Sequence, residues 1–230
     1  MKLASPLVKH VIEIRDNIVS SLVIENPRLF RDYVQGLYDA VAEGVRGFVL
    51  SDDGKEMRIS EEMEFISQLV PFDLNSKVLI AALLKRLEKI ALLPENRLES
   101  ARLVAEVVNY VNRLSMEVSH EIECEKETIG VILKAVGPRF SDDDMSLPNR
   151  VLDYMRLMRD FAGRHIFVFV NARSYLSDME LMEIFDIALA EKLRVFLIDS
   201  VAKGLLPAEN RLLIDDDLCE LTTRDDEDLV

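Results

Sequence analysis

Two long apolar runs, with an amphipathic segment between them, predict a parallel β-sheet in the second half of the chain. The runs at 165–171 and 193–199 contain few polar residues, which is typical of strands that are buried on both faces. Residues 177–191 repeat apolar positions at helical spacing and open with S-x-x-E, a capping box. A strand, a helix and a strand at this spacing predict a right-handed crossover. A helix over 147–162 and a further strand over 211–215 are expected on either side.

The beginning of the chain predicts a second group of strands. Residues 7–14 and 18–24 have strand-like patterns with a turn between them. Apolar positions at helical spacing follow, so we expect a helix over 27–44 that starts at a proline and stops at a glycine. Asp53-Gly54 predicts a hairpin, because both residues tolerate the left-handed backbone of a tight turn.

After Pro71 the pattern changes to amphipathic helices with no strand between them. Residues 74–92 and 95–118 each carry one apolar stripe and are separated by Pro94. They predict an antiparallel helical hairpin. A third helix is expected over 127–136, where a Gly-Pro pair stops it.

These patterns together predict the α/β class, with a helical domain inserted into an α/β domain. We expect the α/β head domain to comprise 1–72 and 138–230, and the inserted helical leg domain to comprise 73–137. Within the head, residues 216–230 are predicted to be a solvated, flexible acidic tail.

Composition narrows the class of protein. Of the 230 residues, 49% are apolar, so a large core can form. The apolar runs are far shorter than the roughly 20 residues that a membrane-spanning helix needs. Only two cysteines occur, Cys124 and Cys219, without C-x-x-C spacing. We therefore expect no disulfide framework and no zinc site, and a cytoplasmic protein with reduced thiols.

The net charge of −14 argues against nucleic acid as a ligand until its distribution is considered. Residues 215–230 hold eight acids and one arginine, a net charge of −7 and half of the total. Residues 73–137 hold nine basic and ten acidic residues, a net charge of −1. A local basic surface is therefore compatible with the sequence.

Motifs of common enzyme classes do not occur in the sequence. There is no G-x-x-x-x-G-K-[ST] loop, and the apolar run at 165–171 ends in Asn171 where a nucleotide hydrolase needs an acid to hold Mg²⁺. Asp199 ends the next run and is expected to cap a strand end. No G-x-S-x-G or H-E-x-x-H motif occurs either. We therefore expect a protein without enzymatic activity.

The segment EIECEKE, residues 121–127, places an acid at every second position. In an extended chain this period of two puts four carboxylates on one face, and a hard cation with oxygen ligands would neutralise their repulsion. The residues alone leave three interpretations open: a solvated linker, a binding site for a hard cation, or a metal-dependent nuclease site built from three of these carboxylates. The candidate metal ligands are these acids and the one a helical turn earlier, namely Glu117, Glu121, Glu123, Glu125 and Glu127.

Basic residues in and after the insert are candidates for contacts with DNA phosphates. Such contacts give sequence-independent binding that weakens with salt. Each cation fits equally well as an ordinary surface residue or as the partner of a nearby acid. The candidates are Lys85, Lys89, Lys134, Arg139, Arg150, Arg156, Arg159 and Arg164.

Four stretches together resemble the accessory family of type II-A CRISPR adaptation, the ring-forming, DNA-end-binding member of the Csn family. They are IVSSLVIENPRLFRDYVQGLYDA near the start, QLVPFDLNSKVLIAALLKRLEK at the entry to the insert, ETIGVILKAVG at its exit, and HIFVFVNARSYLSDMELMEIFDIALAEKLRVFLID in the second half. PFDLNS before a long helix, and FVN followed by a capped helix and a second apolar strand, carry the resemblance in combination. It covers nearly the whole chain.

The resemblance implies a head like that of P-loop NTPases, without nucleotide hydrolysis, and an inserted helical leg. It implies a homotetrameric ring, supported by Ca²⁺ at the acidic segment, that encircles linear double-stranded DNA from its ends. It also implies work beside the CRISPR integrase proteins and the effector nuclease during spacer acquisition in antiviral defence. A protein scaffold with incidental DNA binding is the alternative from another class.

Overall fold

The computed structural model describes residues 1–120, 122–123, 127–141 and 145–223, and the chain divides into two compact units. The head unit comprises Met1–Leu74 and Asp142–Val230, and the helical unit comprises Asn75–Ser141. The helical unit is therefore an insertion into the head unit. The sequence placed the two divisions after residues 72 and 137.

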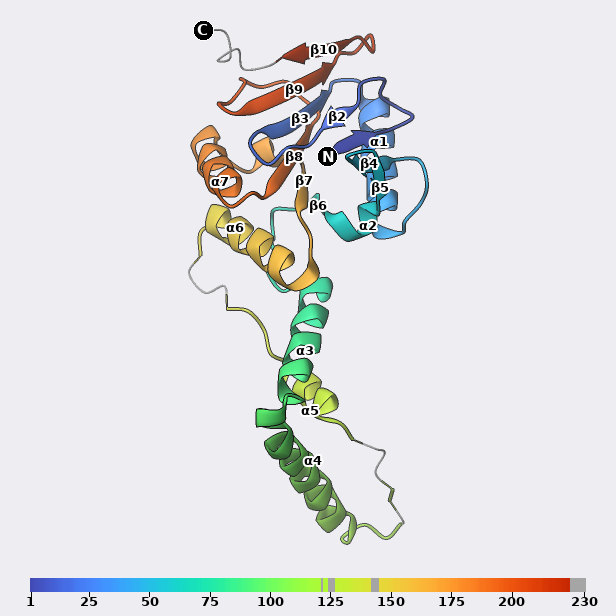
Figure 1. Ribbon diagram of the computed structural model, residues 1–230, viewed down its shortest axis with the longest axis vertical. Coiled ribbons are helices and arrows are strands. Elements are labelled where there is room, and N and C mark those ends of the chain that lie inside the picture. Colours follow the sequence, from blue (N-terminus) through green and yellow to red (C-terminus); the bar gives the residue numbers. More distant parts are fainter. Residues whose placement is uncertain (121, 124–126, 142–144, 224–230) are drawn as a thin grey trace. The chain divides into compact units, whose positions relative to one another are not determined.

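A six-stranded sheet with the order β10-β9-β3-β8-β7-β6 forms the centre of the head unit (Figure 1). Every neighbouring pair is parallel except β9 and β10, which are antiparallel. The sheet and its covering helices confirm the predicted α/β class. The strands are β3 (Val19–Ile24), β6 (Met63–Ile66), β7 (Ile166–Val170), β8 (Arg194–Asp199), β9 (Glu209–Ile214) and β10 (Glu220–Thr223).

The period of two along the buried strands gives the sheet two apolar faces. Val168 and Phe196 belong to one core cluster with Tyr33 of helix α1 (Pro27–Ala42). Their neighbours Phe169 and Leu197 instead line a small apolar cavity beside α7 (Asp178–Ala190). Alternate residues of a strand point to opposite faces, so α1 and α7 cover opposite sides of the sheet. The continuous apolar runs seen in the sequence are explained by this double coverage.

The predicted crossover between β7 and β8 is confirmed. Helix α7 begins with the full capping box between Ser177 and Glu180, and β7 and β8 pair in parallel. Two short segments flank this crossover: a 3₁₀ turn at Ala172–Ser174 after β7, and a π-helical turn at Met158–Ala162 that ends α6 (Leu147–Leu157).

A small antiparallel sheet with the order β2-β1-β4-β5 carries the first residues of the chain. The hairpin at Asp53-Gly54 is confirmed, and both residues have positive φ, at 45° and 78°. The predicted strand over 7–14 is wrong except at Ile12–Glu13, because Pro6 cannot donate and the Ser5 hydroxyl accepts from the Val8 amide, which makes a local turn. The elements here are β1 (Lys2–Ala4), β2 (Ile12–Glu13), β4 (Val49–Asp52), β5 (Lys55–Met57) and the short helix α2 (Ile59–Glu62).

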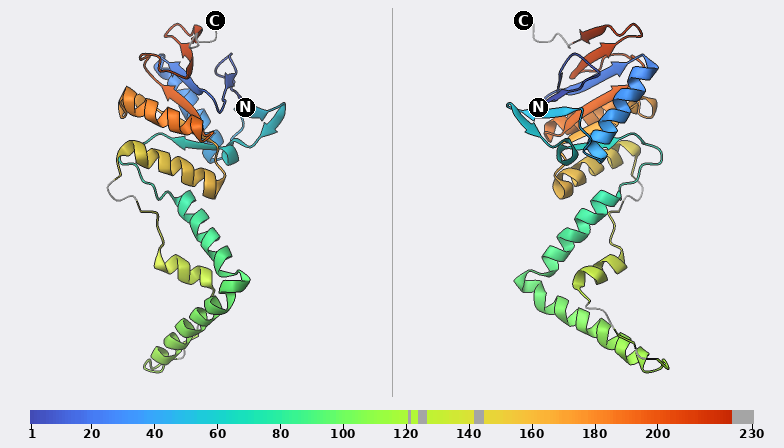
Figure 2. Two further views of the ribbon diagram at one scale, coloured as in Figure 1. Left: turned by 60° about the vertical axis from the view of Figure 1, so that its left-hand side comes forward. Right: turned by 90° about the vertical axis from the view of Figure 1, so that its right-hand side faces the viewer.

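The helical unit contains α3 (Lys77–Ala91), α4 (Pro94–Ser115) and α5 (Ile129–Val136). The predicted antiparallel pairing of the first two helices is wrong: they diverge from their junction, and α5 packs against α3 (Figure 2). Ser100 and Asn96 of α4 donate to the carbonyls of Ala91 and Ile90, at 2.8 and 3.0 Å. These bonds tie the start of α4 across the end of α3, so the chain turns without folding back along α3.

Helix α5 lies close to α3 because its second residue, Gly130, has no side chain. A Cβ atom at this position would come within 2.6 Å of the Glu88 carboxylate on α3. The helix ends at Gly137, which has φ of 69°, as the Gly-Pro signal predicts.

The C-terminal region differs from its prediction. The expected strand over 211–215 is present as β9, but residues 220–223 form strand β10 where a flexible tail was predicted. The Glu220 carboxylate accepts hydrogen bonds from the backbone amides of Lys9 and His10, which fixes the strand to the start of the chain. In the part of the chain that the structure describes, no helix has the length and apolar character needed to cross a membrane.

Candidate functional site

Four basic side chains of the helical unit point into solvent. Lys85 and Lys89 are four positions apart on α3 and so share one face of that helix. Lys134 lies in the last turn of α5, and Arg139 follows shortly after it. All four are exposed, and within the described residues none has an acidic partner. Their charge is therefore available to an external anion.

The division of charge between the two units is uneven. The helical unit, residues 75–141, holds ten basic and nine acidic residues, a net charge of +1. The remaining residues hold eighteen basic and 33 acidic residues, a net charge of −15. Long-range repulsion of a polyanion therefore comes from the head unit.

In the head unit, Arg156 and Arg159 are occupied by neighbouring acids. The Arg156 guanidinium donates to Glu191 at 2.9 Å and to Asp153 at 2.9 Å. Arg159 donates to Glu191 at 3.2 Å and to Asp160 at 2.8 Å. The hydrogen bond from Arg156 lowers the pKa of Glu191. These two candidates tie α6 and its π-helical turn to the end of α7, so they hold the head together.

Arg150 and Arg164 are also used inside the head unit. The Arg150 guanidinium donates to the carbonyls of Phe72 and Met145, at 3.3 and 3.2 Å. Arg164 lies 4.0 Å from the carboxylate of Glu64, whose pKa is raised by burial. The structure thus separates the eight predicted cations into four that face solvent in the helical unit and four with internal contacts in the head.

The predicted metal region lies after α4. Glu117 and Glu123 are exposed and Glu127 is half-buried, whereas Glu121 and Glu125 lie outside the described residues. Among the described residues, no three acidic, histidine or cysteine side chains come together in a way that could hold a metal ion. The donors of the segment are hard oxygen ligands of the kind that calcium takes.

The carboxyl ends of β3, β7 and β8 form the edge at which an open parallel sheet usually binds its ligand. After β3, the side chain of Asn26 accepts from the amides of Arg28 and Leu29, both at 3.1 Å, and so caps α1. After β7, the side chain of Asn171 accepts from the amide and hydroxyl of Ser200. The amides that would meet a phosphate at this helix start are therefore used by the protein itself.

A buried group of charges that the sequence did not predict lies beyond β8. The Glu209 carboxylate, fully buried, accepts from Arg173, from Arg211 and from the amide of Leu206. Asp199 lies 3.4 Å from Arg173, and burial raises the pKa of Asp199 to about 6. The only sequence signal was a charged residue beside an apolar strand at each of these positions.

Helix α4 carries an apolar stripe that is left uncovered within the described residues. The residues recur at helical spacing, and each is between 39% and 54% exposed. They are Leu103, Val107, Tyr110, Val111 and Leu114. A contiguous exposed stripe of this kind is typical of a protein contact surface.

Comparison with known proteins identifies one family. The sequence model described as "CRISPR-associated protein (Cas_Csn2)" matches residues 40–218, which is most of the chain. Solved structures with some likeness include an ATP-binding cassette of an ABC transporter in its ADP conformation, at 12% identity over 89% of this chain and 78% of that chain, with a TM-score of 0.44. A nucleotide-free ATP-binding cassette matches at 11% identity over 94% and 84%, with a TM-score of 0.45. A putative ABC transporter ATP-binding protein from Pyrococcus furiosus matches at 10% identity over 92% and 97%, with a TM-score of 0.41.

Proposed function

The chain belongs to the Cas_Csn2 family of type II-A CRISPR-associated proteins, and from this premise we propose that it is a non-enzymatic protein that binds the ends of double-stranded DNA during spacer acquisition. In this proposal four copies form a ring, calcium supports the ring, and the DNA passes through it without being read in sequence. The integrase proteins and the effector nuclease are its partners, and the cytoplasm is its compartment.

The exposed apolar stripe on α4 is the observation that supports assembly of several copies of the chain. Five apolar side chains at helical spacing are between 39% and 54% exposed among the described residues, and burying such a stripe against a second copy is favourable at roughly 25 cal/mol per Å² of apolar surface. A closed ring needs contacts of this kind between copies. The helical unit is the natural place for them, because its net charge is close to zero.

The exposed cations of the helical unit support the proposal of DNA binding. Lys85, Lys89, Lys134 and Arg139 lack acidic partners among the described residues, whereas the head arginines are engaged internally. Point charges on flexible side chains suit phosphates and do not read bases. We therefore propose that DNA lies against the helical unit and away from the acidic head.

The acidic segment is the proposed calcium-binding site. Five carboxylates occur between Glu117 and Glu127, close to the end of α4. If α4 is a contact surface, copies that meet there bring these carboxylates together, and a divalent cation would relieve their repulsion. In this proposal the metal stabilises the assembly and takes no part in chemistry.

The closed carboxyl edge of the head sheet supports a non-enzymatic role. Asn26 caps the helix start that a nucleotide phosphate would need, and Asn171 stands where a Mg²⁺-binding acid would be required. A protein built in this way can keep the sheet as a scaffold without hydrolysing nucleotide.

Light scattering of the full chain tests the proposal, in calcium and then in chelator, with linear or circular duplex. We expect the mass of four chains in calcium, a smaller mass in chelator, and binding to linear DNA only. Leu103→Glu with Val107→Glu should lower the mass, whereas Leu98→Glu, at an 84% exposed position of the same helix outside the stripe, should leave it unchanged. Equal binding of circular and linear duplex would contradict the proposal that the ring threads onto DNA ends. Cleavage of the DNA would favour a nuclease.

A further inference from the structure

Strand β10 is the edge of the six-stranded sheet, and in the described part of the chain only β9 pairs with it. The Asp215 amide donates to the Cys219 carbonyl at 3.2 Å, so the backbones of these two residues face each other across the hairpin. Because such pairs alternate in an antiparallel ladder, Leu221 bonds to β9 while the peptide groups of Glu220 and Thr222 point outward. The outer side of β10 therefore offers donors and acceptors to one more strand.

The charge around this edge selects the partner. Three successive aspartates, residues 215–217, form the turn before β10, and residues 215–223 hold four acids and no basic residue. A second copy would bring an equally acidic edge alongside, and DNA would be repelled in the same way. We propose that the free edge of β10 is a docking site for an extended, basic segment of a partner protein, which adds to the sheet as a further strand.

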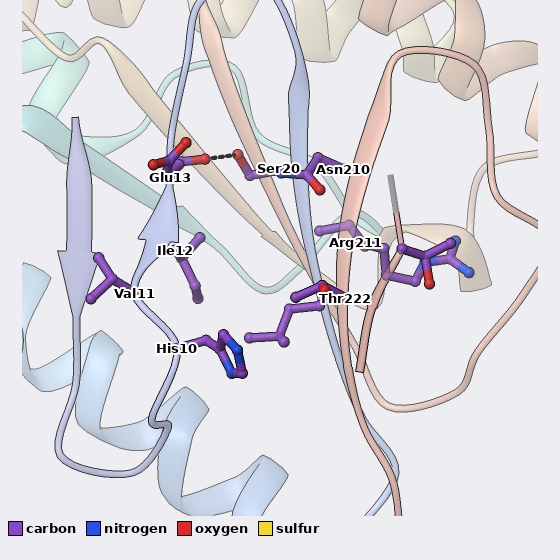
Figure 3. Close-up of a pocket in the computed structure, with 11 residues that line it drawn as sticks. His10, Val11, Ile12, Glu13, Ser20, Asn210, Arg211 and Thr222 are labelled. Carbon is purple, nitrogen blue, oxygen red and sulfur yellow. Dashed lines mark hydrogen bonds between the residues drawn. The ribbon is translucent and has the colours of Figure 1, made fainter. Parts of the chain in front are cut away.

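A cavity beside β10 gives such a segment a place for one side chain. It has a volume of about 500 Å³, with a floor from β3, β9 and β10 and a wall from residues 10–13 (Figure 3). Its lining includes Ser20, Asn210 and Thr222. In strand addition, main-chain bonds supply affinity and pockets for alternate side chains supply selectivity. A polar cavity of this size accommodates a lysine or arginine side chain.

The edge is held in shape before any partner arrives. Glu220 accepts from the amides of Lys9 and His10 at 2.8 and 2.9 Å, and it also contacts the His10 ring. These bonds join β10 to the segment that forms the wall of the cavity. A binding surface that is already ordered loses little entropy when a segment docks.

The probe for the test is an acetylated and amidated (Lys-Thr)₄ peptide, with (Glu-Thr)₄ as its acidic counterpart. Fluorescence anisotropy of the labelled peptides is measured with the full chain. Hydrogen exchange of the backbone amides is followed in the same mixtures. We expect the basic peptide to bind and the acidic peptide not to bind. The Glu220 and Thr222 amides should exchange about tenfold more slowly with the basic peptide bound, because they enter a ladder.

Thr222→Pro is the sharpest variant, because proline removes one outward amide and leaves the bonds between β9 and β10 intact. We expect this change to weaken peptide binding by about tenfold or more, because the ladder loses a donor. Thr222→Val keeps the amide and should bind within about twofold of the natural chain. Thermal melts report whether Thr222→Pro is folded. If it is not, the exchange data on the natural chain decide the question.

Three outcomes would overturn the proposal. Basic peptide bound with no slowing at Glu220 and Thr222 would mean adsorption to acidic residues. Equal binding of both peptides would remove the role of charge. A drop in the mass of the assembly on Thr222→Pro would mean that a second copy occupies the edge. The first two results do not bear on DNA binding or on the α4 stripe, and the α4 variants test the third, the mass of the assembly, separately. Failure here is therefore distinguishable from failure of the proposed function.

Discussion

The head unit and the helical unit differ in whether their charged and apolar side chains are buried. The head buries Glu209, Asp199 and Arg173 in one network and covers both faces of its sheet. The helical unit leaves lysines and an apolar stripe exposed to solvent. The charged network of the head is thus closed within the head, whereas the lysines and the apolar stripe of the helical unit are available to other molecules. A binding surface is therefore identified better by charged side chains that lack an internal partner than by the net charge of a unit.

The largest expected effect is on the buried network. In Glu209→Gln the two arginines lose a carboxylate that is fully buried, so we expect a loss of about 3–5 kcal/mol in the free energy of unfolding. Urea denaturation measures it. Glu183→Gln, an exposed glutamate on α7, is the matched control and should change little. Equal stability of the two variants would mean that the network contributes nothing to the head.

The next effect is a pH dependence from Asp199. Burial raises the pKa of Asp199 from 3.8 to about 6, so the folded state binds a proton more tightly than the unfolded state. Below pH 3.8, Asp199 makes its full contribution to the free energy of unfolding. This contribution is lost as the pH rises through about 6, and the loss is about 3 kcal/mol because one pKa unit corresponds to about 1.4 kcal/mol.

The Asp199→Asn variant removes this titration. Denaturation curves at a series of pH values should therefore show a smaller fall in stability between pH 4 and pH 7 for Asp199→Asn than for the natural chain, and the difference should be roughly the contribution of Asp199. Identical pH profiles would contradict the assignment.

The exposed lysines give a smaller effect, on binding and not on stability. Lys85→Gln with Lys89→Gln should weaken binding of linear duplex by about tenfold, and it should lower the slope of log affinity against log salt by about 2. The matched pair Lys55→Gln with Lys192→Gln removes two exposed lysines of the head and should leave affinity almost unchanged. A reversal of these results would place the DNA on the head.

The smallest effect tests a single buried hydroxyl of the head. The Tyr33 hydroxyl is buried in the apolar core and has no hydrogen-bond partner among the described residues. Tyr33→Phe removes an unsatisfied polar group and should raise stability by about 1 kcal/mol. Thermal melting measures the gain. A loss of stability would reveal a partner for the hydroxyl.

Elements with strong local signals were predictable from the sequence. The apolar runs of β7 and β8 and the capping box of α7 identified the crossover, and Asp53-Gly54 identified its hairpin. Strands β6 and β10 were not predicted, because each is short and interrupted by a charged or polar residue and gains its bonds from a distant partner.

The sites were predictable only as residue types. The sequence identified eight cations, but engagement of Arg156 with Glu191 depends on packing of α6 against α7, which no local pattern encodes. The Arg173–Glu209 contact joins residues 36 positions apart through the fold of an intervening loop. Long-range contacts of this kind decide which charges remain available.

The position of β3 in the sheet has a consequence for how the protein is made. This strand emerges from the ribosome early, yet both of its neighbours, β8 and β9, lie near the end of the chain. The helical unit is continuous in sequence and is complete well before either neighbour is synthesised. The nascent chain must therefore keep the apolar residues of β3 from aggregating until translation is nearly finished, while the inserted helices can already fold beside them.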